Sequence, residues 1–133
     1  MINENDYHSY YKIIERYSMS DIRGFHIHVY FNKLTQSETT AKSVWEKAKQ
    51  DWGEKNVGRF HRDPVGPHTT GSFLIWVNPE ERDKALEWTT DNRDGLKAMM
   101  HKVTDDDLHD HTEAVTWYGD GGPHILDVSI FKP

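Results

Sequence analysis

Residues 24–31 read GFHIHVYF and alternate apolar and polar side chains with period two. A strand with this period directs successive side chains to opposite faces of its sheet. The apolar side chains therefore predict a core face, whereas His26, His28 and Tyr30 share the other face. Imidazoles two residues apart on a strand are separated by about 7 Å. This pair indicates a wet cavity or a metal site, but a half-buried sheet face also accommodates histidine as a spacer.

Composition narrows the class of protein. A chain of 133 residues predicts one domain with a modest core, and a formal net charge of −6 argues against a nucleic-acid or anionic-membrane surface. The absence of cysteine excludes disulfides, thiolate zinc sites and a cysteine nucleophile, and it fits a reducing cytoplasm, which is the expected location. Neither a membrane span nor a signal-peptide pattern is expected.

Histidine is frequent for a chain of this length. Nine histidines are dispersed through the sequence rather than grouped as a tag. Without thiols, any metal site must use imidazole and carboxylate ligands, which suit iron, zinc, manganese or nickel.

Periodicity and capping residues predict the remaining elements. Thr35 to Glu38 reads as a capping box, and a helix with apolar residues at helical spacing follows and ends at Gly53. Asn78 and Pro79 are typical of the start of a second helix. The other expected elements are strands at 57–62, 72–77 and 96–103, a third helix that runs from 104 to 118, and a short last strand at 126–130.

This order predicts an α+β fold with a ferredoxin-like β-α-β-β-α-β antiparallel sheet, an added C-terminal helix and a short strand. Residues 1–21 are expected to form an N-terminal arm and residues 22–133 a single domain. Both main helices should cover one face of the sheet, where Trp45, Trp52 and Trp88 are expected. The third helix or a second subunit must cover the other face, so a homodimer is expected.

Further histidines converge on the same predicted face as His26 and His28. They are placed on three strand segments and on the added helix: His61, His68, His101 and His111. A packed core does not gather several imidazoles, because each neutral ring needs both a donor and an acceptor partner. The sequence therefore predicts a functional histidine site.

The chain resembles the small bacterial and fungal DOPA 4,5-dioxygenase family. The matching segments are FHIHVYF at 25–31, GRFHRDPVGPH at 58–68, HKVTDDDLHDHTE at 101–113 and WYG at 117–119. The resemblance implies extradiol-type ring cleavage of a catechol such as L-DOPA with O₂ and a non-haem metal. Members of the family usually have proline where Lys102 stands, and a glycine-rich turn where this chain has Val103 to Asp106.

Chemical roles can be predicted for these residues. Extradiol chemistry needs a divalent metal with open positions, which three protein ligands leave. We expect His26, His28 and His68 as the ligands of Fe(II), with zinc or another divalent metal as a substitute, because a rigid strand and a proline-stiffened turn hold these three rings. His101 and His111 are the expected acid–base groups.

The predicted substrate contacts come from the same face and from the segment that follows the first helix. Arg59 or Arg62 is expected to bind a substrate carboxylate in bidentate fashion, with Tyr30 and His61 as further contacts. A solvent-facing arginine is an equally good interpretation of both positions.

Two other functions fit a ferredoxin-like chain. One is a cofactorless or haem-using monooxygenase, which would need an apolar cavity, and the histidine content argues against it. The other is a non-enzymatic metal-binding or small-ligand-binding module, in which a closed four-ligand zinc site would be expected.

Overall fold

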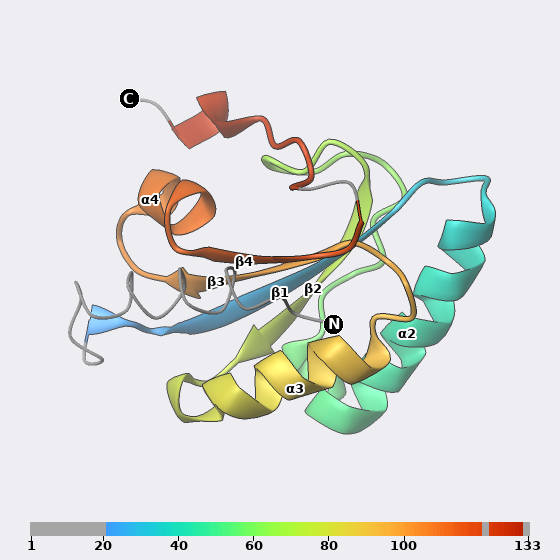
Figure 1. Ribbon diagram of the computed structural model, residues 1–133, viewed down its shortest axis with the longest axis horizontal. Helices are drawn as coiled ribbons and strands as arrows, with labels where there is room; N and C mark the ends of the chain where they lie inside the picture. The colour runs from blue at the N-terminus through green and yellow to red at the C-terminus, as the bar shows by residue number, and fades with distance from the viewer. Residues whose placement is uncertain (1–20, 121–122, 132–133) are drawn as a thin grey trace.

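The computed structural model describes residues 21–120 and 123–131, so nearly all of the predicted arm at 1–21 lies outside the described residues. Its centre is a four-stranded antiparallel sheet of order β2-β1-β3-β4 (Figure 1). The strands are β1 (Gly24–Phe31), β2 (Gly71–Val77), β3 (Ala98–Val103) and β4 (Val115–Tyr118). The α+β class, the antiparallel sheet and the central first strand are confirmed.

Two helices, α2 (Gln36–Trp52) and α3 (Arg82–Asn92), cover one face of this sheet (Figure 1). The Thr35 hydroxyl accepts a hydrogen bond from the Ser37 amide (3.2 Å), and Leu34 N donates to the Glu38 carboxylate (3.0 Å). The predicted capping residues therefore act at the start of α2, although Glu38 serves Leu34 rather than Thr35. Gly53, at φ +90°, ends the helix, and its amide donates to the Lys49 carbonyl. A 3₁₀ turn at Pro79–Glu81 precedes α3.

The core lies between the helices and the sheet. Phe25, Ile27 and Val29 of β1 are fully buried there, as their alternation predicted. Trp52 and Trp88 belong to the same core, and Trp45 packs at its edge, where its indole donates to the Gly58 carbonyl (2.9 Å). His26, His28 and Tyr30, which alternate with these core residues, are thereby directed to the opposite face.

The expected strand at 57–62 is present only as two isolated bridges to the outer edge of β2. Val57 bridges to Ile75, and His61 bridges to Ser72. The register shifts by one residue between these bridges, so a regular ladder does not form. The ferredoxin-like order is retained, with an irregular edge in place of a full strand.

The prediction of one helix from 104 to 118 is wrong. Helix α4 spans only Asp107–Thr112, and β4 follows as a strand that pairs with β3. The sequence VTWY of β4 is β-branched and aromatic, which favours a strand. Its alternation also matches the sheet, since Thr116 and Tyr118 are buried while Val115 and Trp117 are half-buried.

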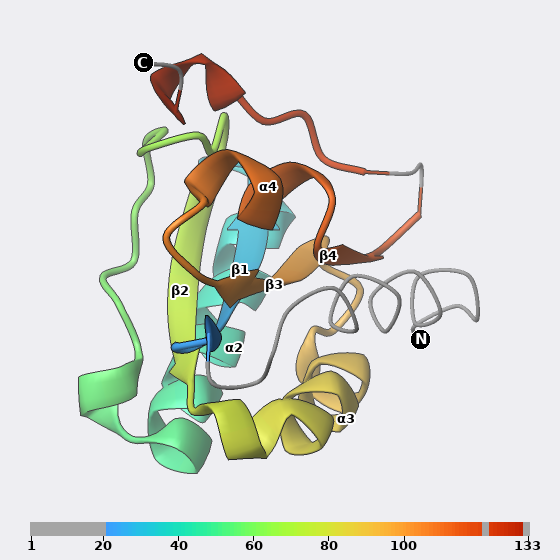
Figure 2. The ribbon, with the colours of Figure 1, turned by 90° about the vertical axis from the view of Figure 1, so that its left-hand side faces the viewer.

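The predicted last strand at 126–130 is also wrong. Leu126 makes a single bridge to His68, and Val128–Phe131 form a 3₁₀ helix, η4. Helix α4 and the segment 123–131 lie over the face opposite α2 and α3 (Figures 1 and 2). The cover over this face therefore comes from the chain itself, and association as a homodimer stays a prediction. No helix among the described residues is both long and apolar enough to cross a bilayer.

A buried ion pair fixes α4 to the end of β3. Lys102 and Asp110 are fully buried, and the Lys102 ammonium donates to the Asp110 carboxylate. The same carboxylate accepts hydrogen bonds from the Thr104 amide (2.6 Å) and the Thr104 hydroxyl (2.9 Å). His111 follows Asp110 directly, so this network sets where that ring lies.

We predict that Asp110→Asn lowers the free energy of unfolding by about 3–5 kcal/mol, because it leaves the buried Lys102 charge without its counter-charge. Urea denaturation followed by circular dichroism measures this change. Asp107→Asn, at an exposed position of the same helix, is the control and should change stability by about 0.5 kcal/mol or less. Equal stability of both variants would refute a structural role for the pair.

Candidate functional site

Strand register brings three imidazoles together on the face that α4 covers. His26 of β1 stands directly opposite His101 of β3, and His28 stands opposite Met99. Directly opposed residues of an antiparallel pair point to the same face. The ring nitrogens of His26, His28 and His101 accordingly offer ligand atoms that all lie within 4.8 Å of one another.

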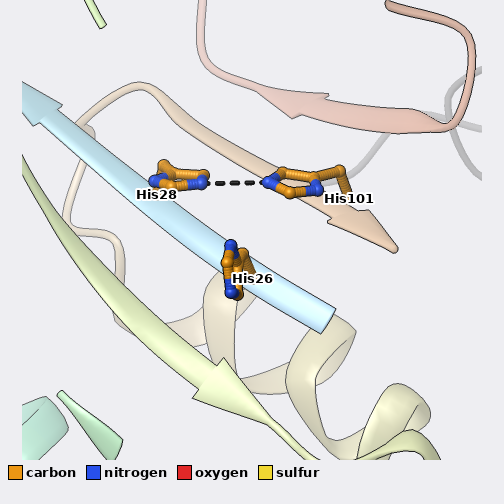
Figure 3. Close-up of side chains that lie close together, drawn as sticks. All are labelled: His26, His28 and His101. Atoms are coloured by element: carbon orange, nitrogen blue, oxygen red, sulfur yellow. Dashed lines mark hydrogen bonds between the residues drawn. The ribbon is translucent and has the colours of Figure 1, made fainter. Parts of the chain in front are cut away.

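His28 and His101 approach most closely. Their Nε2 atoms lie 3.0 Å apart, and Figure 3 shows the two rings reaching toward each other from neighbouring strands with His26 beside them. His28 is 6% exposed and His101 is 1% exposed. Two buried imidazole nitrogens at this distance form a site where a small cation can replace the hydrogen bond between them.

Two further histidines flank this trio. The His68 ring lies 4.1 Å from the His28 ring, and the His111 ring lies 4.1 Å from the His101 ring, measured between centroids. Phe131 of η4 covers His111 at 4.7 Å. Five of the predicted histidines thus converge, from β1, β3, α4 and the segment before β2.

Backbone carbonyls fix the tautomers of two rings. Nδ1 of His101 lies 2.7 Å from the Lys102 carbonyl oxygen, and Nδ1 of His111 lies 2.8 Å from the Asp107 carbonyl oxygen. A carbonyl oxygen only accepts, so each Nδ1 carries a hydrogen. When either ring is neutral, its Nε2 therefore presents a lone pair. In metal sites, a hydrogen bond from one ring nitrogen to a carbonyl oxygen also orients a histidine whose other nitrogen binds the metal.

Burial keeps the cluster neutral. Desolvation, followed by the neighbouring imidazoles, lowers the pKa of His28 and of His101 well below the ordinary value of 6.5. Burial likewise lowers the pKa of His26 and of His68 to about 4. The pKa of His111 is lowered by burial, against the opposing effect of the Asp107 carbonyl. At neutral pH the five imidazole rings on this face are therefore uncharged, and their unprotonated nitrogens have lone pairs that can bind a metal.

Tyr30 extends the site away from the trio. Its hydroxyl lies 2.8 Å from Nδ1 of His68, and its ring stacks on His124 at 4.2 Å and near Trp117 at 6.3 Å. Burial raises the pKa of the Tyr30 hydroxyl, so the phenol stays protonated. Tyr30 therefore joins the histidine cluster to a set of aromatic rings.

The remaining predicted contacts lie elsewhere. The Arg62 guanidinium pairs with Glu38 in the first turn of α2, on the helix side of the sheet (3.1 Å for the second of two contacts). Arg59 is exposed, and His61 is half-buried beside Ser72 at the irregular edge. The structure thus does not bring the two arginines to the histidine cluster, and their role stays a prediction.

Sequence reasoning missed three side chains near Tyr30. Alternation from His101 through Met99 places Lys97 on the same face, so this residue could have been identified from the sequence. Trp117 was hidden because its segment was interpreted as helix. His124 lies in a loop without a periodic pattern and gave no signal.

The fold and the site define a class: a small α+β protein with a buried, uncharged polyhistidine site on the face of an antiparallel sheet. Comparison with known sequences identifies the family within this class. The profile of the Dopa 4,5-dioxygenase family matches residues 25–129, and the chain belongs to this family.

Two fungal proteins are similar to this chain. An uncharacterized 21.2 kDa protein of Botryotinia fuckeliana is 33% identical over 123 residues, and the DOPA 4,5-dioxygenase of Amanita muscaria is 31% identical over 110 residues. These matches cover 85% and 78% of this chain but only 66% and 48% of the relatives. The chain therefore spans about two thirds and about half of the lengths of these proteins.

A solved structure shows the same fold. The crystal structure of a candidate dioxygenase from Nostoc punctiforme matches with a TM-score of 0.68 and 28% identity. The match covers 84% of this chain and 93% of that one.

We predict that the metal-free protein loses stability as the pH falls from about 6.5 to about 4. In this interval the unfolded histidines bind protons, whereas His26 and His68 in the folded state do not, since their pKa is about 4. Stability is thus complete above pH 6.5 and declines toward the folded-state pKa. Thermal unfolding in EDTA across this range measures the effect, and His68→Gln should flatten the curve. A melting temperature independent of pH would contradict neutral burial.

Proposed function

We propose that this chain is an extradiol-type ring-cleaving dioxygenase that acts on a catechol such as L-DOPA with O₂ and non-haem Fe(II). The observation that carries the proposal is the meeting of the half-buried His26 with the buried His28 and His101, whose Nε2 atoms lie 3.0 Å apart. Membership in the Dopa 4,5-dioxygenase family supports the reaction class, and the Amanita muscaria relative supports the choice of L-DOPA.

The donor set fits a divalent cation. His26, His28 and His101 would hold it, so His101 takes the place that the sequence analysis gave to His68. The three rings are neutral donors, and the Lys102 carbonyl orients the lone pair of His101. A metal held by these three histidines would supply the activation of catechol and O₂ that ring cleavage needs.

His111 is the proposed proton acceptor. Its Nδ1 is held by the Asp107 carbonyl, so Nε2 has a lone pair for a catechol hydroxyl proton. Its lowered pKa keeps this nitrogen unprotonated at neutral pH. His68, paired with the Tyr30 hydroxyl, is the second acid–base group on the other side of the trio. Both O₂ atoms enter the ring-opened product, so the reaction needs no external reductant.

We predict different losses for two alanine variants. His28→Ala removes a proposed ligand and should lose both bound metal and activity. His111→Ala should keep the metal and still bind catechol but lose about 100-fold or more in turnover, as for a general base. Metal content by plasma emission spectrometry and oxygen uptake with catechols measure the two effects.

The wild-type protein, purified without chelator and reloaded with Fe(II) under nitrogen, is the reference for both variants. A metal-free His111 variant beside a metal-loaded His28 variant would reverse the proposed roles. A wild-type protein that binds metal in a closed four-ligand site and consumes no oxygen would instead favour a non-enzymatic metal-binding module.

A further inference from the structure

The segment from 123 to 131 contacts both of the histidines that flank the trio. Leu126 bridges to His68, and the Phe131 ring lies 4.7 Å from the His111 ring, measured between centroids. Figures 1 and 2 show this segment beside α4, over the face of the sheet that carries the histidines. The trio stands on the two central strands, whereas the flanking rings are each held from outside by this segment.

The spacing of the rings leaves no room for a further aromatic ring between them. The centroid of the His111 ring lies 6.2 Å from that of His28 and 6.4 Å from that of His68. A ring placed between two others needs about 7 Å between their centroids, because carbon atoms pack at about 3.5 Å or more. His28 and His101 are also almost fully buried. A planar aromatic substrate can therefore reach the trio only after the flanking rings move away.

The two covers of this face differ in how firmly they are held. Helix α4 is fixed to β3 by the buried pair of Lys102 and Asp110. Every residue from 123 to 131 is instead exposed or half-buried, and Ile125 is 79% exposed. Segments that bury little apolar surface open at a lower free-energy cost than core elements do. The segment 123–131 is therefore the part of the cover that opens most easily.

The contacts that attach this segment can break without exposing the hydrophobic core. The Asp127 amide donates to the Pro67 carbonyl (2.7 Å), directly beside His68. Nearer the start of the segment, the His124 ring stacks on Tyr30 at 4.2 Å. Both contacts lie on the histidine side of the sheet, so the packing against α2 and α3 remains intact when they are lost.

We propose that residues 123–131 form a strap that opens to admit the substrate and, when it closes, holds His68 and His111 against the bound substrate. Leu126 and Phe131 are positioning residues, because they act through these two histidines. The acid–base roles of the two rings rest on the proposed function, whereas the opening of the strap does not. Closure of such a segment over a bound substrate also excludes water from the site.

Hydrogen exchange measures the opening without metal or substrate. The Asp127 amide bonds to Pro67 from the strap, and the Asp110 amide bonds to the Asp106 carbonyl within α4 (2.9 Å). After correction for intrinsic rates, we expect the Asp127 amide to exchange at least about tenfold faster, as measured by NMR. Equal protection of the two amides would mean that the strap and α4 open together, which would overturn the proposal.

A reversible lock tests whether the strap controls His68. Thr69 and Ile125 are exposed and stand opposite each other beside the bridge of Leu126 to His68, with the Thr69 hydroxyl 2.6 Å from the Ile125 carbonyl oxygen. Directly opposed residues have Cα atoms about 4.5–5.5 Å apart, which a disulfide spans. The native chain has no cysteine, so Thr69→Cys/Ile125→Cys can form one disulfide within the chain.

The readout of this lock is the reaction of unprotonated imidazole with diethyl pyrocarbonate in metal-free protein. We expect acylation of His68, measured by peptide mass spectrometry, to be about tenfold slower in the oxidised form than in the reduced form. His61, which lies outside the cluster, is the internal reference and should react equally in both forms. Equal rates at His68 in the two forms would overturn the proposal.

The other end of the strap is tested at His111. Phe131→Ala should raise the acylation rate of His111 about tenfold, because the ring that covers it is removed. Ile130→Ala, at a 53% exposed neighbour in η4, is the matched control and should leave that rate unchanged. Equal rates in the two variants would overturn the assignment of Phe131.

Kinetics of the iron-loaded protein link the strap to turnover. Oxidation of the Thr69→Cys/Ile125→Cys lock should lower kcat/KM for 4-methylcatechol about tenfold at unchanged metal content, and reduction should restore it. An unchanged kcat/KM would overturn the role of the strap in catalysis. If the wild type cleaves no catechol, the proposed function fails, and hydrogen exchange and acylation still decide whether the strap opens.

Discussion

The structure depends on the register between β1 and β3. This register sets His26 opposite His101 and leaves His28 beside Met99, so that three imidazoles meet over two adjacent strands. A shift by one residue would direct the histidines of β1 into the helix-covered core and its apolar residues toward α4. Packing of Phe25, Ile27 and Val29 against the helices prevents this shift, so the hydrophobic core and the position of the site are fixed together.

The position of helix α4, which carries His111, depends on a different interaction. Lys102 follows His101 in β3, so its side chain starts from the opposite face of the strand. Its ammonium nevertheless forms an ion pair with Asp110, and this pair holds α4 against the strand. In this chain a buried ion pair and the Thr104 contacts hold α4, and His111 is placed against His101 as a result.

The sequence predicted the parts of the fold that periodicity specifies. The alternation of β1 identified both its core face and the face of His26 and His28, and the capping residues located α2. Segments whose pattern fits two structures were misjudged: VTWY at 115–118 has apolar residues that suit a helix stripe as well as a strand, and pairing with β3 decides the outcome. The choice of His101 over His68 beside His28 could not be predicted, because it depends on the distance between rings rather than on spacing along the chain.

The central claim is that the facing histidines of β1 and β3 hold a divalent metal. The most direct test is a crystal structure of the iron-loaded protein, prepared without oxygen, with anomalous data collected on both sides of the iron absorption edge. The account predicts one iron peak bonded to ring nitrogens of His26, His28 and His101, with the remaining positions open. Iron bonded to His68 in place of His101, or a peak away from this face, would contradict it.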